Sequence, residues 1–111
     1  MIDNILEERG SRYGEFKGHA ELTQALRRNF SIYSRNYSRL TPSMVEAIEM
    51  IFHKLGRIGN GDPTYLDSWI DIVGYTQLVI NELKKQQQQE VDSPAVEVDA
   101  NANASVTKSL T

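Results

Sequence analysis

The stretch from Glu46 to Tyr75 restricts the fold of this chain more than any other. It reads EAIEMIFHKLGRIGNGDPTYLDSWIDIVGY, with a Gly-Asn-Gly-Asp-Pro turn in the middle. Apolar residues recur at helical spacing on both sides of the turn. They are Val45, Ile48, Ile51, Phe52, Leu55 and Ile58 before it, and Leu66, Trp69, Ile70, Ile72, Val73, Val79, Ile80 and Leu83 after it. The pattern predicts two helices, 43–59 and 63–86, paired as a central antiparallel hairpin.

Local signals place the ends of these helices. Ser43 is the predicted N-cap of the first, with Glu46 three residues later completing a capping box. The Gly-Asn-Gly run ends that helix, because Gly and Asn tolerate positive φ. Asp62 is the predicted N-cap of the second helix and Pro63 its first residue.

The rest of the chain also favours helices. A short helix is expected over Ile2 to Arg9, ended by Gly10 and Gly14, since two nearby glycines favour a turn. A longer helix is expected over 16–33, followed by a loop over 34–40. These elements predict an all-α domain over residues 1–90, a small helical bundle. The last residues, 91–111, are small, polar and acidic, which predicts a disordered tail.

Composition narrows the class of protein. The chain has no cysteine and a formal net charge of −3. Thiolate metal sites are therefore excluded, and a cytoplasmic protein is expected. No apolar run is long enough for a membrane span, and the charged N-terminus lacks a signal-peptide core. The mildly basic start is too balanced for a duplex nucleic-acid surface.

Size points to self-association. About ninety folded residues give a marginal core, and oligomerisation is a common remedy. The helix over 63–86 is apolar on more than one face, so a homo-oligomer is expected.

The hairpin carries a candidate metal site. Glu46, Glu49 and His53 fall within about 60° of one another on an ideal helix. Asp67 and Asp71 are one turn apart on the next helix. A hairpin that brings four carboxylates together suits Mg²⁺ or Mn²⁺, which prefer oxygen ligands.

A plainer interpretation stands beside this one. Carboxylates on exposed helix edges usually form a solvated face. Asp67 then serves only the first turn of its helix, where the helix dipole favours anions. Glu46 then acts only as the partner of Ser43 in the capping box.

Three segments carry a family resemblance: ILEERGSRYGEF, EAIEMIFHKLGRI and NGDPTYLDSWIDIVGY. They resemble a family of small uncharacterised proteins from tailed phages. More distantly, the layout is similar to MazG-like all-α nucleotide pyrophosphohydrolases. That resemblance implies Mg²⁺-dependent hydrolysis of a nucleoside triphosphate to the monophosphate and pyrophosphate. It also implies a dimer or tetramer, located in the host cytoplasm if the chain is phage-encoded.

The resemblance also implies roles for individual residues. Glu46 and Glu49 match part of the first acidic motif, where they are catalytic and bind metal. Asp67 and Asp71 stand at the second motif and complete the metal ligands. The pattern differs at position 45, a valine here in place of an acidic residue, and in the four-residue spacing of the two aspartates.

Residues around these motifs are the expected contacts to a nucleotide. Lys54 and Arg57 would neutralise its phosphates, with His53 beside them. Arg12 and Tyr13, on a loop flanked by glycines, would contact its base or sugar.

Two alternatives to the enzyme remain open. One is a non-catalytic phage accessory protein that binds a nucleotide signal or a host protein through the same groove. The other is a structural helical oligomer with a solvated acidic edge.

Overall fold

The computed structural model describes residues 2–92, where all the regular elements are helices and there is no strand. The predicted all-α class is therefore confirmed. The chain divides into two compact units, residues 1–79 and 80–111. In the second unit the described residues are the end of one helix, α4 (Leu66–Asp92). The first unit holds the start of α4 and all the other helices.

The first helix, α1 (Ile2–Tyr13), is longer than predicted. The break expected near Gly10 is wrong, because a glycine inside a helix costs only about 1 kcal/mol and does not force a turn. The chain turns instead at Gly14, whose φ of 80° lies in the left-handed region. Asn60 Nδ2 donates hydrogen bonds to the carbonyls on either side of this turn, those of Tyr13 and Glu15, at 3.3 and 2.9 Å.

The second helix, α2 (Phe16–Tyr33), has the predicted limits. The predicted loop over 34–40 is confirmed, with one short 3-10 turn, η1 (Tyr37–Arg39), inside it.

The third helix, α3 (Pro42–Asn60), begins one residue earlier than predicted. Its N-cap is Thr41, whose hydroxyl accepts a hydrogen bond from the Met44 amide at 3.2 Å. The predicted cap at Ser43 is wrong, because Pro42 sits at the first helical position, where its missing N–H and fixed φ are tolerated. The end of α3 at the glycine run is confirmed, with Gly61 as its C-cap.

The fourth helix, α4, starts three residues later than predicted. Asp62 does not cap it: its Oδ1 accepts from the amide and hydroxyl of Thr64, at 2.9 and 2.7 Å. This closes a local turn over Asp62 to Tyr65, a common use of aspartate, and leaves Pro63 outside the helix. The helix reaches Asp92, so residues 91 and 92 of the predicted tail are helical. The remaining tail residues, 93–111, lie outside the described residues.

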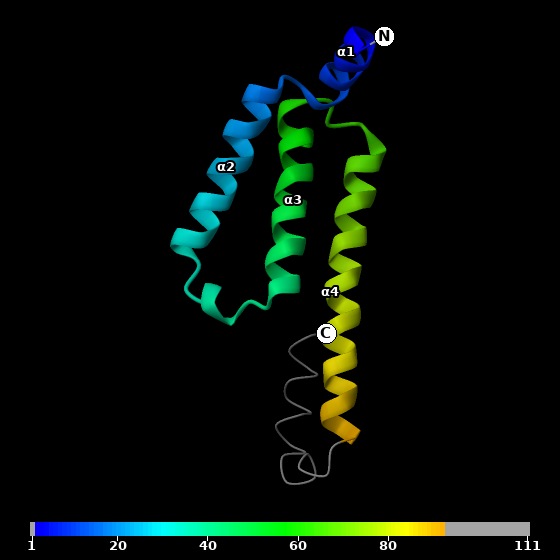
Figure 1. The fold of residues 1–111 in the computed structure, drawn as a ribbon. Helices are drawn as coiled ribbons and strands as arrows, with labels where there is room; N and C mark the ends of the chain where they lie inside the picture. Colours follow the sequence, from blue (N-terminus) through cyan, green and yellow to red (C-terminus); the bar gives the residue numbers. More distant parts are fainter. Residues whose placement is uncertain (1, 93–111) are drawn as a thin grey trace. The chain divides into compact units, whose positions relative to one another are not determined.

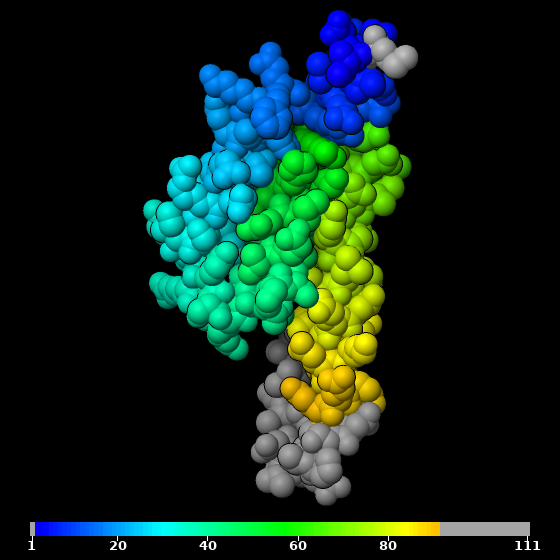
Figure 2. Space-filling model, in the orientation of Figure 1, coloured from blue at the N-terminus to red at the C-terminus, as the bar shows by residue number. Residues whose placement is uncertain are grey.

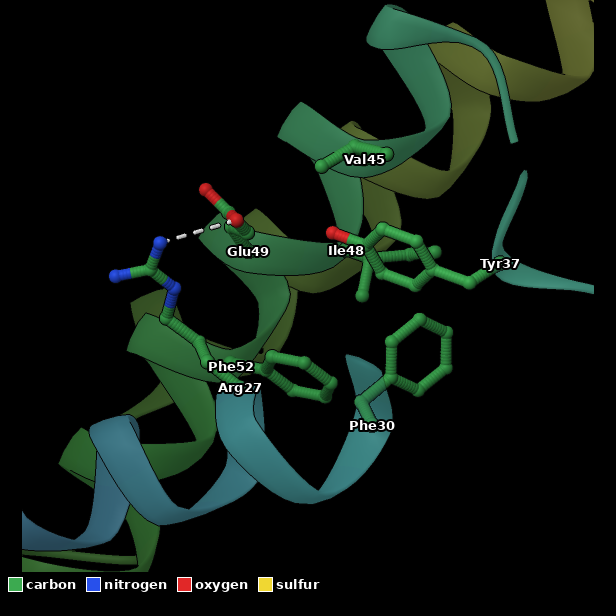
Figure 3. A pocket seen from close by; sticks show the side chains of 7 residues that line it. All are labelled: Arg27, Phe30, Tyr37, Val45, Ile48, Glu49 and Phe52. Atoms are coloured by element: carbon green, nitrogen blue, oxygen red, sulfur yellow. Dashed lines mark hydrogen bonds and ion pairs between the residues drawn. The ribbon is translucent and has the colours of Figure 1, made fainter. Parts of the chain in front are cut away.

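Packing in the first unit centres on α3. Helix α2 lies along one side of it and the start of α4 along another, running antiparallel to α3 (Figure 1). Side chains fill the space between the ribbons of α2 and α3 (Figure 2). Phe30 of α2 meets Phe52 of α3 and Tyr37 of η1 edge to face, with ring centroids 5.5 and 6.1 Å apart (Figure 3). Within residues 2–92, no helix is long and apolar enough to cross a membrane.

Candidate functional site

Two histidines face each other between α2 and α3. His19 Nε2 lies 3.3 Å from His53 Nδ1, and the rings meet edge to face with centroids 4.6 Å apart. His19 is buried, with 8% of its surface exposed. A Cβ at Gly56 would lie 2.6 Å from Thr23 Oγ1 and 2.9 Å from the His19 ring. The missing side chain of Gly56 therefore allows the helices to approach and the imidazoles to pair.

Burial favours the neutral form of both imidazoles. It lowers the pKa of His19 below the usual value, partly offset by the Gly56 backbone, with the charge of Arg57 adding to the lowering. Burial also lowers the pKa of His53, with further lowering by Arg57, His19 and Lys54. At neutral pH the pair is therefore uncharged, with cationic side chains next to it.

The histidine pair lies at a cavity of about 700 Å³ formed by α1, α2 and α3. This volume falls within the range of small-molecule sites, roughly 300–1,000 Å³. Its lining contains cationic, aromatic and apolar side chains with one carboxylate: Leu6, Arg9, Tyr13, Glu15, Phe16, His19, His53 and Arg57, together with Gly10 and Gly14. The cavity thus combines positive charge with aromatic surface.

Aromatic rings hold the arginines near this cavity. The Arg57 guanidinium lies 4.2 Å from the centre of the Tyr13 ring. Arg12 lies over Tyr65 at 4.9 Å, donates to its hydroxyl at 3.1 Å, and pairs with Glu8 at 2.9 Å. Contacts of this kind orient a guanidinium while leaving its donors available.

The end of α3 fixes the position of α1 against the cavity. The Asp62 amide donates to the Arg12 carbonyl at 2.6 Å. A Cβ at Gly14 or Gly18 would collide with Asn60, and one at Gly61 would collide with the backbone of Arg12 and Tyr13. At Gly14 and Gly61 these close backbone contacts require glycine, and they hold α1 where its residues line one cavity with His19 and Arg57.

The four predicted metal ligands are engaged separately. Glu49 accepts from Arg27 of α2 at 3.2 Å, as Figure 3 shows. Asp71 pairs with Lys54 at 2.9 Å, and Asp67 accepts from the Tyr65 hydroxyl at 3.1 Å. Glu46 is exposed on α3.

As the described side chains lie, these carboxylates do not fit a magnesium ion. Within residues 2–92, no three groups of the ligating types come together as a metal site. The reason is the rotation of α3. Glu49 and Lys54 are about 140° apart on a helix. The edge that carries Glu49 and His53 faces α2, whereas Lys54 faces α4. Magnesium binding stays a prediction.

The predicted nucleotide contacts divide into two groups. Tyr13, His53 and Arg57 line the cavity, and Arg12 is next to it through Tyr65. Lys54 is buried beside Asp71 on the side of α3 that faces α4.

Sequence reasoning missed His19, Arg9 and Phe16 as cavity residues. One signal pointed to His19. It lies three residues before Leu22 and seven before Leu26, so it falls on the apolar side of α2. A histidine on that side needs a polar partner, and His53 supplies it.

Comparison of the chain with protein-family models, curated proteins and solved structures finds no match. The fold and the cavity are therefore the basis for inferring function.

Proposed function

We propose that this protein binds a nucleotide in the cavity between α1, α2 and α3, with its phosphates next to Arg57, Arg9 and the histidine pair. One observation carries the proposal: two guanidinium groups and two imidazoles line one cavity of ligand size. Guanidinium groups bind phosphate oxygens in a bidentate manner, and charge-assisted hydrogen bonds of this kind are the strong ones.

The aromatic side chains of the lining support a nucleotide over a bare phosphate. Phe16 is 82% exposed, so packing within the described part of the chain does not account for its ring. A nucleobase stacked on an exposed aromatic ring gains roughly 1–3 kcal/mol. Tyr13 offers a second ring at the same cavity.

The neutral histidine pair suits an anionic ligand. Because Arg57 is next to both rings, a cation in the cavity meets repulsion, whereas a phosphate adds a negative charge that balances the arginines. A bound phosphate also favours protonation of an imidazole, which then donates a further hydrogen bond.

Hydrolysis of the bound nucleotide stays a prediction of the family resemblance, with Glu46 and Glu49 as its catalytic residues and Mg²⁺ as its cofactor. Their present ion-pair and solvent environments give no support for a metal-dependent step. The non-catalytic alternative needs only the cavity, and it is the function that we place first.

The test is calorimetric titration with ATP, ADP, AMP and pyrophosphate. Arg57→Ala should weaken ATP binding about 10- to 100-fold, since a hydrogen bond to a charged group contributes roughly 1.5–3 kcal/mol. Arg28→Ala is the matched control, because Arg28 is exposed on α2 and does not line this cavity. It should bind like the wild type.

Two results would contradict the proposal. The first is absence of binding by all four ligands at millimolar concentration. The second is equal affinity of the Arg57→Ala and Arg28→Ala variants. Adding Mg²⁺ and measuring released pyrophosphate tests hydrolysis in the same samples, and binding without turnover identifies a nucleotide-binding protein.

A further inference from the structure

One side of α4 carries a row of exposed apolar side chains. Leu66, Trp69, Ile70 and Val73 recur at spacings of three and four, so they share one face of the helix. Their exposed fractions are 66, 49, 53 and 67%. We call these four residues the α4 stripe. It contains no charged residue.

The opposite side of α4 is turned to its own unit. Ser68 is buried and Asp71 pairs with Lys54 of α3. Helix α3 lies along that side (Figure 1). The stripe therefore does not belong to the packing of α4 on α3, and it is an exposed apolar face of the helix.

The Trp69 ring is fixed in a partly exposed position. Its indole Nε1 donates to the Pro63 carbonyl at 2.8 Å, which fixes the ring while about half of the residue stays exposed. A fixed aromatic ring loses little entropy on binding, and tryptophan is enriched at the residues that dominate interface energies.

We propose that the α4 stripe is the surface through which two copies of this chain associate. The partner that covers the stripe is a second copy of this chain, because the apolar stripe needs to be buried whenever the chain is folded. Among the hydrophobic residues in the described range, only Ala47 is buried. A fold with so small a core requires a partner that is present whenever the chain is, and another copy meets that condition.

The available area agrees with a dimer. Four exposed side chains of this size offer on the order of 400 Å² per copy. Two copies, with the polar groups around the stripe, reach roughly the 1,000 Å² that separates specific interfaces from casual contacts. Because a two-fold dimer uses the same patch twice, an uncharged stripe introduces no like-charge repulsion.

The chain supplies both a probe and a matched control. Trp69 is the one tryptophan in the sequence, so its emission reports on the stripe alone. Leu78 is also exposed on α4, at 60%, but it lies about 140° around the helix from Val73. Val73→Glu places a charge in the stripe, and Leu78→Glu places the same charge outside it.

Sedimentation velocity across a dilution series is the test. We expect the wild type and Leu78→Glu to be dimers at micromolar concentration, with a red shift of Trp69 emission on dilution. Val73→Glu should dissociate about 100-fold more readily. If Val73→Glu fails to fold, the milder Ile70→Ser takes its place, and its midpoint of thermal unfolding should depend on concentration less steeply than that of Leu78→Glu, because association stabilises a weaker dimer less.

A wild type that sediments as a monomer at all concentrations would overturn the proposal. A dimer that Leu78→Glu and Val73→Glu weaken equally would do the same. So would Trp69 emission that stays constant on dilution but shifts on addition of lipid vesicles, because the stripe would then bind a membrane surface.

Discussion

The part-buried His19–His53 pair is the residue-scale feature on which the proposed site depends. Only one of the two histidines can be recognised from the sequence as a candidate site residue. His53 stands out by its place beside two glutamates on one helix edge, whereas His19 is hidden on the apolar side of another helix. Which helix faces that edge depends on the rotation of α3. That rotation is set by tertiary contacts such as Phe30 with Phe52, and helical period alone does not give it.

The histidine pair predicts how stability depends on pH. Both pKa values are lowered in the folded state from 6.5, so the unfolded chain binds protons more readily. Stability is then full above about pH 6.5 and falls as the pH drops below it, because protonation favours the unfolded state. Thermal melting from about pH 7.5 to about pH 5.5 should show this decline.

His53→Gln is the matching variant, since it keeps a hydrogen-bonding group without a titrating one. Its melting temperature should depend less on pH over that range than that of the wild type. Pyrophosphate should also flatten the wild-type profile, because a bound anion favours the protonated ring. Equal slopes for wild type and variant would show that the pair does not control acid stability.

At the scale of the helices, some ends follow from the sequence and others do not. The limits of α2 and the end of α3 follow from periodicity and from the glycine run. The starts of α3 and α4 each offer two polar candidates within a few residues. Thr41 caps α3 because Pro42 follows it, and Asp62 closes a turn with Thr64 before α4 begins. Such competition between neighbouring hydrogen bonds is decided by geometry that the sequence does not display.

Substitution of two nearby glycines by alanine should change the stability of the protein in opposite directions. Gly10 lies inside α1, and a Cβ added there would meet no atom within 4 Å, so Gly10→Ala should stabilise the protein by about 0.4–1 kcal/mol. Gly14 has positive φ, and a Cβ there would meet the Asn60 carbonyl. Gly14→Ala should destabilise by more than about 1 kcal/mol. Urea unfolding followed by circular dichroism measures both.

The comparison is informative because each substitution adds one methyl group, at two closely spaced positions. Destabilisation by Gly10→Ala would show that α1 ends near Gly10, as the sequence pattern indicates. If Gly14→Ala leaves the free energy of unfolding unchanged, the turn at Gly14 does not hold α1 against the end of α3. The residues of α1 would then not be fixed as part of the cavity lining.

At the scale of the whole molecule, the helical class and the reversal of the chain between α3 and α4 can be predicted from the sequence. Which helices enclose the site cannot. The predicted metal site needs the acidic edge of α3 to face α4. In the structure that edge faces α2, where Arg27 neutralises Glu49 and His19 meets His53. Three of the expected nucleotide contacts therefore lie at the cavity, while the carboxylates are dispersed.

The most direct test of the central claim is an NMR titration of the uniformly ¹⁵N-labelled protein with ATP. Binding in the cavity predicts that the largest amide shifts cluster at Gly10, Gly14, His19 and Arg57, on three different helices and the turn between two of them. Arg57→Ala should remove that cluster, whereas Arg28→Ala should keep it. Shifts centred on Asp67 and Asp71, or no shifts at millimolar ATP, would contradict a nucleotide site between α1, α2 and α3.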